Sequence, residues 1–160
     1  MNKIVSTALL LVIGWQVSAQ TDEMSILKRH ELKLDIGYLL TGTLKGEYEY
    51  LLNDWSSVGA SAIYNNSDAE FKAQVVGTYR LYFDTQPVSG FFLEGNAGVI
   101  VADEYWYGSN NLMVGAGIAL GWKYYIPQPS IVLDLFLGVG RLFGNEGTYP
   151  RVGICIGKRF

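Results

Sequence analysis

Apolar and polar residues alternate along most of this 160-residue chain with a period of two, which is the repeat of a β-strand rather than of a helix. The alternating segments are rich in valine, isoleucine, tyrosine, phenylalanine and leucine, and stretches such as "NNSD" and "PQPS" separate them with turn-forming residues. The pattern predicts eight strands and no helix, with the strands over residues 31–41, 44–52, 55–64, 71–83, 91–101, 112–126, 131–143 and 151–160.

Eight consecutive strands joined by short connections are typical of a closed, antiparallel up-and-down β-barrel. The predicted fold class is therefore all-β, with one barrel domain over residues 31–160. A tilted strand of about 9–11 residues is also long enough to cross a bilayer. The barrel is expected to be transmembrane if its apolar face points outward.

The two faces of the predicted strands differ in their chemistry. One face is apolar and rich in aromatic residues, and its only charged residues, Arg141 and Lys158, lie near strand ends. The other face carries ten glycines and charged residues of both signs. These charged residues are Lys33, Asp35, Lys45, Glu47, Glu49, Lys72, Arg80, Glu94, Lys123, Asp134, Arg151 and Arg159.

Volume and glycine content indicate which face points inward. The interior of an eight-stranded barrel is only wide enough for side chains to fill it, so about forty apolar residues cannot fit there. Glycine weakens a strand that faces water, but in a cramped interior it leaves room for neighbouring arginine, lysine and glutamate side chains. The charged face is therefore predicted to line the interior, where opposite charges must pair. The pattern leaves the individual pairs open.

Aromatic residues near strand ends agree with a membrane barrel, because such rings form belts at both interfaces. With the N-terminus on the periplasmic side, the periplasmic belt is predicted to contain Tyr50, Phe83, Phe91, Tyr124 and Phe160. The outer belt is predicted to contain Tyr64, Phe71, Tyr105, Trp106, Tyr107 and Tyr149.

The first thirty residues precede the barrel pattern. Residues 1–19 are typical of a cleaved secretory signal, with Lys3, an apolar run and small residues before the expected cleavage site, and residues 20–30 are expected to form a short periplasmic leader. Removing Lys3 leaves eleven Lys+Arg against fifteen Asp+Glu, a net charge of −4, which offers no basic face for nucleic acid. The single cysteine, Cys155, excludes an intramolecular disulfide and is expected to be an inert filler of the interior.

Catalysis is not expected from this sequence. Its one histidine, His30, precedes the first predicted strand at the periplasmic end, whereas a lipid-cutting barrel needs a base near the outer leaflet. Glu47 and Glu49 resemble a glycosidase pair or an ion site, but their phase puts them beside interior cations and favours a salt-bridge network. With one histidine, one cysteine and no ligand spacing, neither a metal nor a cofactor is expected.

The stretch "DEYWYGSNN" is the candidate for an external interaction site. Its three aromatic residues, Tyr105, Trp106 and Tyr107, could stack on sugars or on an extracellular partner protein. The alternative interpretation is that they extend the outer aromatic belt, and the general occurrence of such belts favours it.

Several runs carry a family resemblance across residues 31–160, among them "YLLTGTLKGEYEYLLNDWSSVGASAIY", "YRLYF", "GFFLEGNAGV", "LFLGVGRLFG" and "YPRVGICIGKRF". Together they resemble a family of small outer-membrane barrels of Gram-negative bacteria that has no assigned function. The resemblance implies an eight-stranded barrel of the OmpA and OmpX type, and it implies no catalytic residues. The last strand, which ends in Phe160, also resembles the signal recognised by the outer-membrane barrel assembly machinery.

The sequence thus favours a small, monomeric, integral outer-membrane barrel with a structural or surface-interaction role, surrounded by outer-membrane lipid and lipopolysaccharide. One alternative is a soluble periplasmic lipocalin-like barrel that binds an apolar ligand in its interior. A second alternative is a lipid-modifying outer-membrane enzyme.

Overall fold

The computed structural model describes residues 28–64, 71–84, 86–102, 112–143 and 147–160. Its strands are β1 (His30–Asp35), β2 (Leu44–Asn53), β3 (Ser56–Tyr64), β4 (Phe71–Tyr82), β5 (Gly90–Ala102), β6 (Leu112–Ile126), β7 (Ile131–Phe143) and β8 (Thr148–Arg159). A short helix, α2 (Ile36–Leu40), follows β1.

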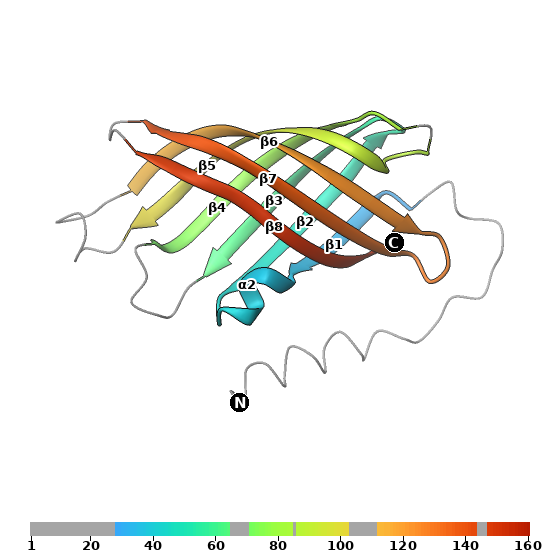
Figure 1. Cartoon of the computed structure of the whole chain (residues 1–160), viewed down its shortest axis with the longest axis horizontal. Helices are drawn as coiled ribbons and strands as arrows, with labels where there is room; N and C mark the ends of the chain where they lie inside the picture. The colour runs from blue at the N-terminus through green and yellow to red at the C-terminus, as the bar shows by residue number, and fades with distance from the viewer. Residues whose placement is uncertain (1–27, 65–70, 85, 103–111, 144–146) are drawn as a thin grey trace.

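Each strand pairs antiparallel with the next one, and β8 pairs with β1, so the sheet closes into a barrel in simple sequence order (Figure 1). Two backbone hydrogen bonds join the two ends of the barrel sequence: Phe160 N donates to His30 O at 2.8 Å, and His30 N donates to Phe160 O at 3.1 Å. We call the end of the barrel with these two bonds the terminal end, and the end where β5 stops and β6 begins the far end. The predicted all-β, eight-stranded, antiparallel up-and-down barrel is confirmed.

Strands β2 to β8 lie where the sequence predicted them, but the first predicted strand is wrong beyond Asp35. The chain turns there into α2, because the Asp35 side chain caps the helix by accepting from Tyr38 N at 3.3 Å. Gly42 follows the helix with φ +82°, a left-handed conformation that ends helices and suits glycine. Among the described residues, no helix has the length and apolar character needed to cross a membrane.

Side chains alternate between the two faces of the wall as the pattern predicted. On β7, Leu135 and Leu137 are 58% and 70% exposed, whereas Asp134 and Phe136 between and beside them are each 2% exposed. Every strand presents large apolar side chains outward in this way. The barrel is therefore apolar outside and mostly charged or small inside.

Aromatic and aliphatic side chains share the interior with the charges. A cluster of Leu51, Tyr82, Val88, Phe92, Phe136 and Cys155 fills the part of the barrel nearer the terminal end. A second cluster of Ile100, Met113, Leu142 and Tyr149 fills the far end. Interior glycines make room for these rings, since a Cβ on Gly153 would overlap the Phe136 ring.

The prediction that Tyr149 belongs to the outer aromatic belt is wrong. Its ring lies inside the barrel with 3% exposure, and its hydroxyl donates to Asn96 Oδ1 at 2.6 Å. Tyr149 has the same phase on β8 as the inward residue Arg151, and it packs over the interior glycine Gly140. The side chain of Phe71 and residues 105–107, which were predicted for the same belt, lie outside the described residues.

Candidate functional site: the buried charge network

The interior holds a balanced set of charges. Eleven of the twelve charged residues that the pattern assigned to the inner face are buried, and the side chain of the twelfth, Lys72, lies outside the part of the chain that the structure describes. Glu31, which was not in the predicted set, is also buried. Among the described side chains, the buried charged residues are thus six acids (Glu31, Asp35, Glu47, Glu49, Glu94 and Asp134) and six bases (Lys33, Lys45, Arg80, Lys123, Arg151 and Arg159), with a formal sum of zero.

Arg80 is the centre of this network. Its Nε lies 2.8 Å from Glu94, directly across the β4–β5 ladder, and its Nη1 lies 2.7 Å from Glu49 and 2.8 Å from Asp134. Its Nη2 lies 2.7 Å from Glu47. One guanidinium therefore joins carboxylates from β2, β5 and β7, which its five donors in a fixed planar fork suit well.

Lys33 and Lys123 extend the network toward the terminal end. Lys33 Nζ lies 2.6 Å from Asp134 and 3.0 Å from Glu47, and it also pairs with Glu49. Lys123 Nζ lies 2.7 Å from both Glu31 and Glu49. Each ammonium thus contacts at least two carboxylates, which compensates part of the large cost of removing it from water.

The terminal end of the interior is closed by Arg159. Its Nη2 lies 2.7 Å from Glu31 and donates to Val88 O at 3.0 Å, and its guanidinium carbon lies 3.9 Å from the centre of the Tyr125 ring. The main chain of the preceding segment also contacts this end, because Leu51 N donates to Arg29 O at 2.8 Å. The Arg159 side chain therefore occupies the terminal end of the interior, where it is buried and paired.

Toward the far end the network becomes smaller. Arg151 Nε lies 2.8 Å from Glu94, and Asn96 and Tyr149 continue the hydrogen bonds from Glu94 toward the apolar cluster at the far end. Lys45 pairs with Asp35 at 2.7 Å beside α2.

The rings of Phe136 and Phe92 make cation–π contacts with the buried cations. The guanidinium carbons of Arg80 and Arg151 each lie 4.6 Å from an aromatic centroid, Arg80 over Phe92 and Arg151 over Phe136. Lys45 Nζ lies 4.9 Å from the Phe136 centroid. Rings at these distances stabilise cations through their electron-rich faces, so the aromatic residues belong to the network as much as the acids do.

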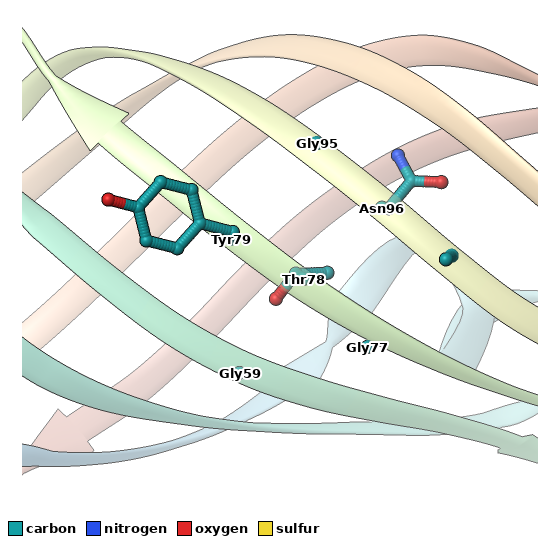
Figure 2. Close-up of a pocket in the computed structure, with 7 residues that line it drawn as sticks. Gly59, Gly77, Thr78, Tyr79, Gly95 and Asn96 are labelled. Carbon is teal, nitrogen blue, oxygen red and sulfur yellow. The ribbon is translucent and has the colours of Figure 1, made fainter.

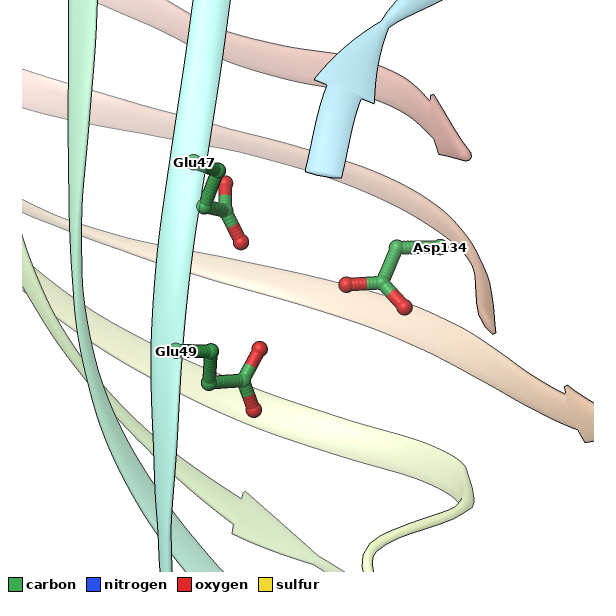
Figure 3. A group of neighbouring side chains, drawn as sticks. All are labelled: Glu47, Glu49 and Asp134. Carbon is green, nitrogen blue, oxygen red and sulfur yellow. The ribbon is translucent and has the colours of Figure 1, made fainter. Parts of the chain in front are cut away.

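Three carboxylates in this network lie close enough to hold a metal ion. Figure 3 shows Glu47 and Glu49 on one strand facing Asp134 from across the barrel, and their ligand oxygens lie within 4.8 Å of one another. All three carboxylates already pair with Lys33 and Arg80, so these side chains supply the positive charge that a metal ion would bring. The donor set therefore suits an internal salt-bridge network better than a metal.

The outer wall has a shallow groove of about 490 Å³ across β3, β4 and β5 (Figure 2). It is lined by Gly59, Gly77, Thr78, Tyr79, Gly95, Asn96 and Ala97. Gly77 and Gly95 lie on the exposed face, so the groove exists because two outward positions lack a side chain. No charged residue lines it, and its residues suggest no catalytic chemistry.

The remaining candidate residues are three aromatic residues of one connection and the C-terminal phenylalanine. Tyr105, Trp106 and Tyr107 lie outside the described residues. Phe160 lies at the terminal end, 48% exposed, with its ring stacked on His30 at a centroid distance of 5.8 Å.

Comparisons of the chain with models of protein families, with curated proteins and with solved structures find no match. The family resemblance described above therefore stays a prediction, and the function has to be inferred from the chain itself.

Sequence reasoning missed Glu31 and the interior aromatic residues. Glu31 shares the phase of Lys33 and Asp35, so the alternation contained the signal that would have found it. The same holds for Tyr82, which has the phase of Arg80 and whose hydroxyl donates to Glu49 at 2.6 Å.

Proposed function

We propose that this chain is a small integral barrel of a bacterial outer membrane, with a structural or surface-interaction role and no catalysis. The observation that carries the proposal is the inverted distribution of polarity in the described barrel. Large apolar side chains cover the outside of every strand, and twelve charged side chains are buried inside. Apolar surface of this extent is costly in water but is solvated well by lipid tails.

Aromatic side chains near the strand ends support a membrane position. At the terminal end, His30 packs against Tyr50 and Phe160 at centroid distances of 5.1 and 5.8 Å, and Phe83 and Phe91 form a second pair at 6.1 Å. Rings with one apolar face and one polar edge or group favour the interface between lipid tails and headgroups.

The filled interior argues against the alternative of a soluble barrel around an apolar ligand. Such a ligand would have to displace buried ion pairs, for example those of Arg80 with Glu49 and Glu94. Displacing them would leave unpaired charges buried inside the barrel, at a cost of several kcal/mol each. The same filled interior disfavours an open aqueous channel, which larger barrels provide.

The proposed partners follow from this position. Outer-membrane lipid and lipopolysaccharide would surround the apolar wall, and the barrel assembly machinery would insert it, in agreement with the export signal predicted over residues 1–19. We propose a monomer. The balanced interior network, in this proposal, makes the barrel a rigid frame for the connections at the far end.

Cell fractionation and a heat-shift assay test the proposal directly. The protein is expected in the outer-membrane fraction, and the unboiled sample should migrate differently from the boiled one on a semi-native gel, because folded membrane barrels resist the detergent. Recovery in the soluble periplasm without a mobility shift would contradict the proposal.

Leu135→Arg sharpens the same test. Leu135 points outward near the middle of β7, so arginine there should destabilise a membrane barrel by about 2–4 kcal/mol and reduce the folded, unboiled band. Gln128→Arg, in the exposed turn between β6 and β7, is the matched control and should change little. In a water-soluble barrel both substitutions would be tolerated alike.

A further inference from the structure

The wall of the barrel is incomplete between its first and last strands. On its β7 side, β8 is paired from Lys158 to Thr148. On its β1 side, β8 is paired only from Arg159 to Cys155. Residues 148–154 of β8 therefore extend beyond the β1 ladder, and α2 packs beside them instead of a strand. We call this stretch the seam.

Side chains take the place of ladder hydrogen bonds at the seam. Ile154 N donates to Asp35 Oδ1 at 3.4 Å, and Lys45 Nζ donates to Val152 O at 3.0 Å. Pro150 has no N–H to donate. The contact of Ile154 is longer than the usual 2.7–3.2 Å of an N–H···O bond, so it is weaker than the backbone bond it replaces.

The sequence of α2 is suited to a strand as well as to a helix. In an extended chain, residues 36–40 would continue the alternation of β1, which is why the pattern predicted a strand there. A five-residue helix is far too short to be stable alone. It depends on Asp35 at its start and on the left-handed Gly42 just after its end.

Continuing the β1–β8 register would close the seam. Asp35 lies opposite Cys155, so residues 36, 37 and 38 would lie opposite Ile154, Gly153 and Val152. Phe160 exchanges both backbone bonds with His30, so even-numbered residues of β8 direct their N–H and C=O groups toward β1. The two groups now contacted by side chains, Ile154 N–H and Val152 C=O, are therefore groups that residues 36–38 would bond.

The two residues that would face each other in the closed seam are both glycines, Gly37 and Gly153. Gly37 would lie opposite Gly153, the position in an antiparallel ladder where the two chains approach most closely. A Cβ at Gly153 would overlap the Phe136 ring and lie 2.6 Å from Asp35 Oδ2, so the inner face of β8 beside the seam has no room for a side chain at this position.

We propose that the seam is a two-state lateral gate in which residues 36–38 exchange between α2 and an extension of β1. In the helical state, Asp35 and Lys45 hold the edge of β8. In the strand state, backbone hydrogen bonds to Val152 and Ile154 close the wall. The exchange is a property of the barrel itself; that the helical state opens the wall toward lipid rests on the proposed function.

Nuclear magnetic resonance on the full chain, folded in detergent micelles, tests the exchange independently of where the protein lives. The strand state has a close contact between the α-protons of Gly37 and Gly153, and strand-type carbon shifts at residues 36–38. Gly42→Ala penalises the left-handed end of α2 and should raise the strand population about five- to tenfold. Gly46→Ala is the matched control, because a Cβ there meets nothing within 4 Å and the backbone is an ordinary strand.

The expected result is a Gly37–Gly153 contact that strengthens in Gly42→Ala and not in Gly46→Ala. Two results would overturn the gate. In one, Gly42→Ala keeps the same helical shifts as the wild type; in the other, residues 36–40 become irregular without any contact to Gly153. A soluble, non-membrane barrel that still showed the exchange would overturn the proposed function and leave the gate standing.

Discussion

The interior of this barrel is filled in two different ways. The layer around Arg80 consists of paired charges, in which Arg80, Lys33, Lys123 and Arg151 each contact two or more carboxylates. The layer at the far end consists of the buried residues Ile100, Met113, Leu142 and Tyr149, which form an apolar cluster. Both layers are buried inside the same barrel, so the comparison separates what charge pairing and apolar packing each contribute to its stability.

The two layers should respond differently to the loss of one side chain. A buried charge destabilises the folded state unless it is paired. Removing one charged side chain therefore leaves every partner that it contacted without full compensation. An apolar side chain leaves only a cavity, whose cost grows with the volume removed. A single substitution in the charged layer should therefore cause a large loss in the free energy of unfolding. In the apolar layer the loss should be smaller and should grow with the volume removed.

Arg80→Met is expected to have the largest effect. It leaves Glu47, Glu49, Glu94 and Asp134 with fewer cations than negative charges, and it should lower the free energy of unfolding by about 3–5 kcal/mol. Urea unfolding from lipid vesicles would measure it. Arg80→Lys keeps the positive charge but not the planar guanidinium, so it should lower the free energy of unfolding by less than Arg80→Met does.

Arg141→Met is the matched control for this loss. Arg141 is exposed on the outer face of β7, near the strand end, and should contribute little by comparison. Equal losses for Arg80→Met and Arg141→Met would show that the charged layer is not held together by Arg80.

Leu142→Ala tests the apolar layer and should have a smaller effect. Leu142 is 3% exposed and packs in the far-end cluster, so the cavity should cost about 2–3 kcal/mol in the same vesicle assay. Leu137→Ala on the same strand makes no interior cavity, because Leu137 is 70% exposed, and its loss should be smaller. If both substitutions cost the same, the far-end cluster is not a packed layer.

The contrast between the layers also explains how far the sequence could predict them. Alternation assigns a side chain to a face wherever a strand is regular, which is why Lys33, Arg80 and Asp134 were placed inside correctly. The pairing of those charges could not be predicted, because it depends on the register between strands distant in the sequence. Lys33 meets Asp134 only because closure of the barrel places β1 and β7 on either side of β8.

The errors arise where a local signal competes with a tertiary one. Residues 36–40 alternate like a strand, but the Asp35 cap and the ion pair of Asp35 with Lys45 favour a helix there, and neither can be read from periodicity. Tyr149 was predicted for the outer belt because aromatic residues near strand ends usually lie there. Its phase, which matches Arg151, was the better guide.

Tyr149→Phe should have the smallest effect and tests the boundary between the two layers. The Tyr149 hydroxyl donates to Asn96 Oδ1 at 2.6 Å, and Asn96 in turn donates to Glu94 Oε1 at 3.3 Å, so this chain of bonds links the apolar layer to the charged one. Removing the hydroxyl keeps the ring and should cost about 0.5–1.5 kcal/mol in vesicle unfolding, the net contribution of one hydrogen bond. Tyr124→Phe, with its ring 58% exposed on the outer wall, removes the same group without disturbing the interior. An equal loss in the two variants would mean that the layers are stabilised independently, with no polar link between them.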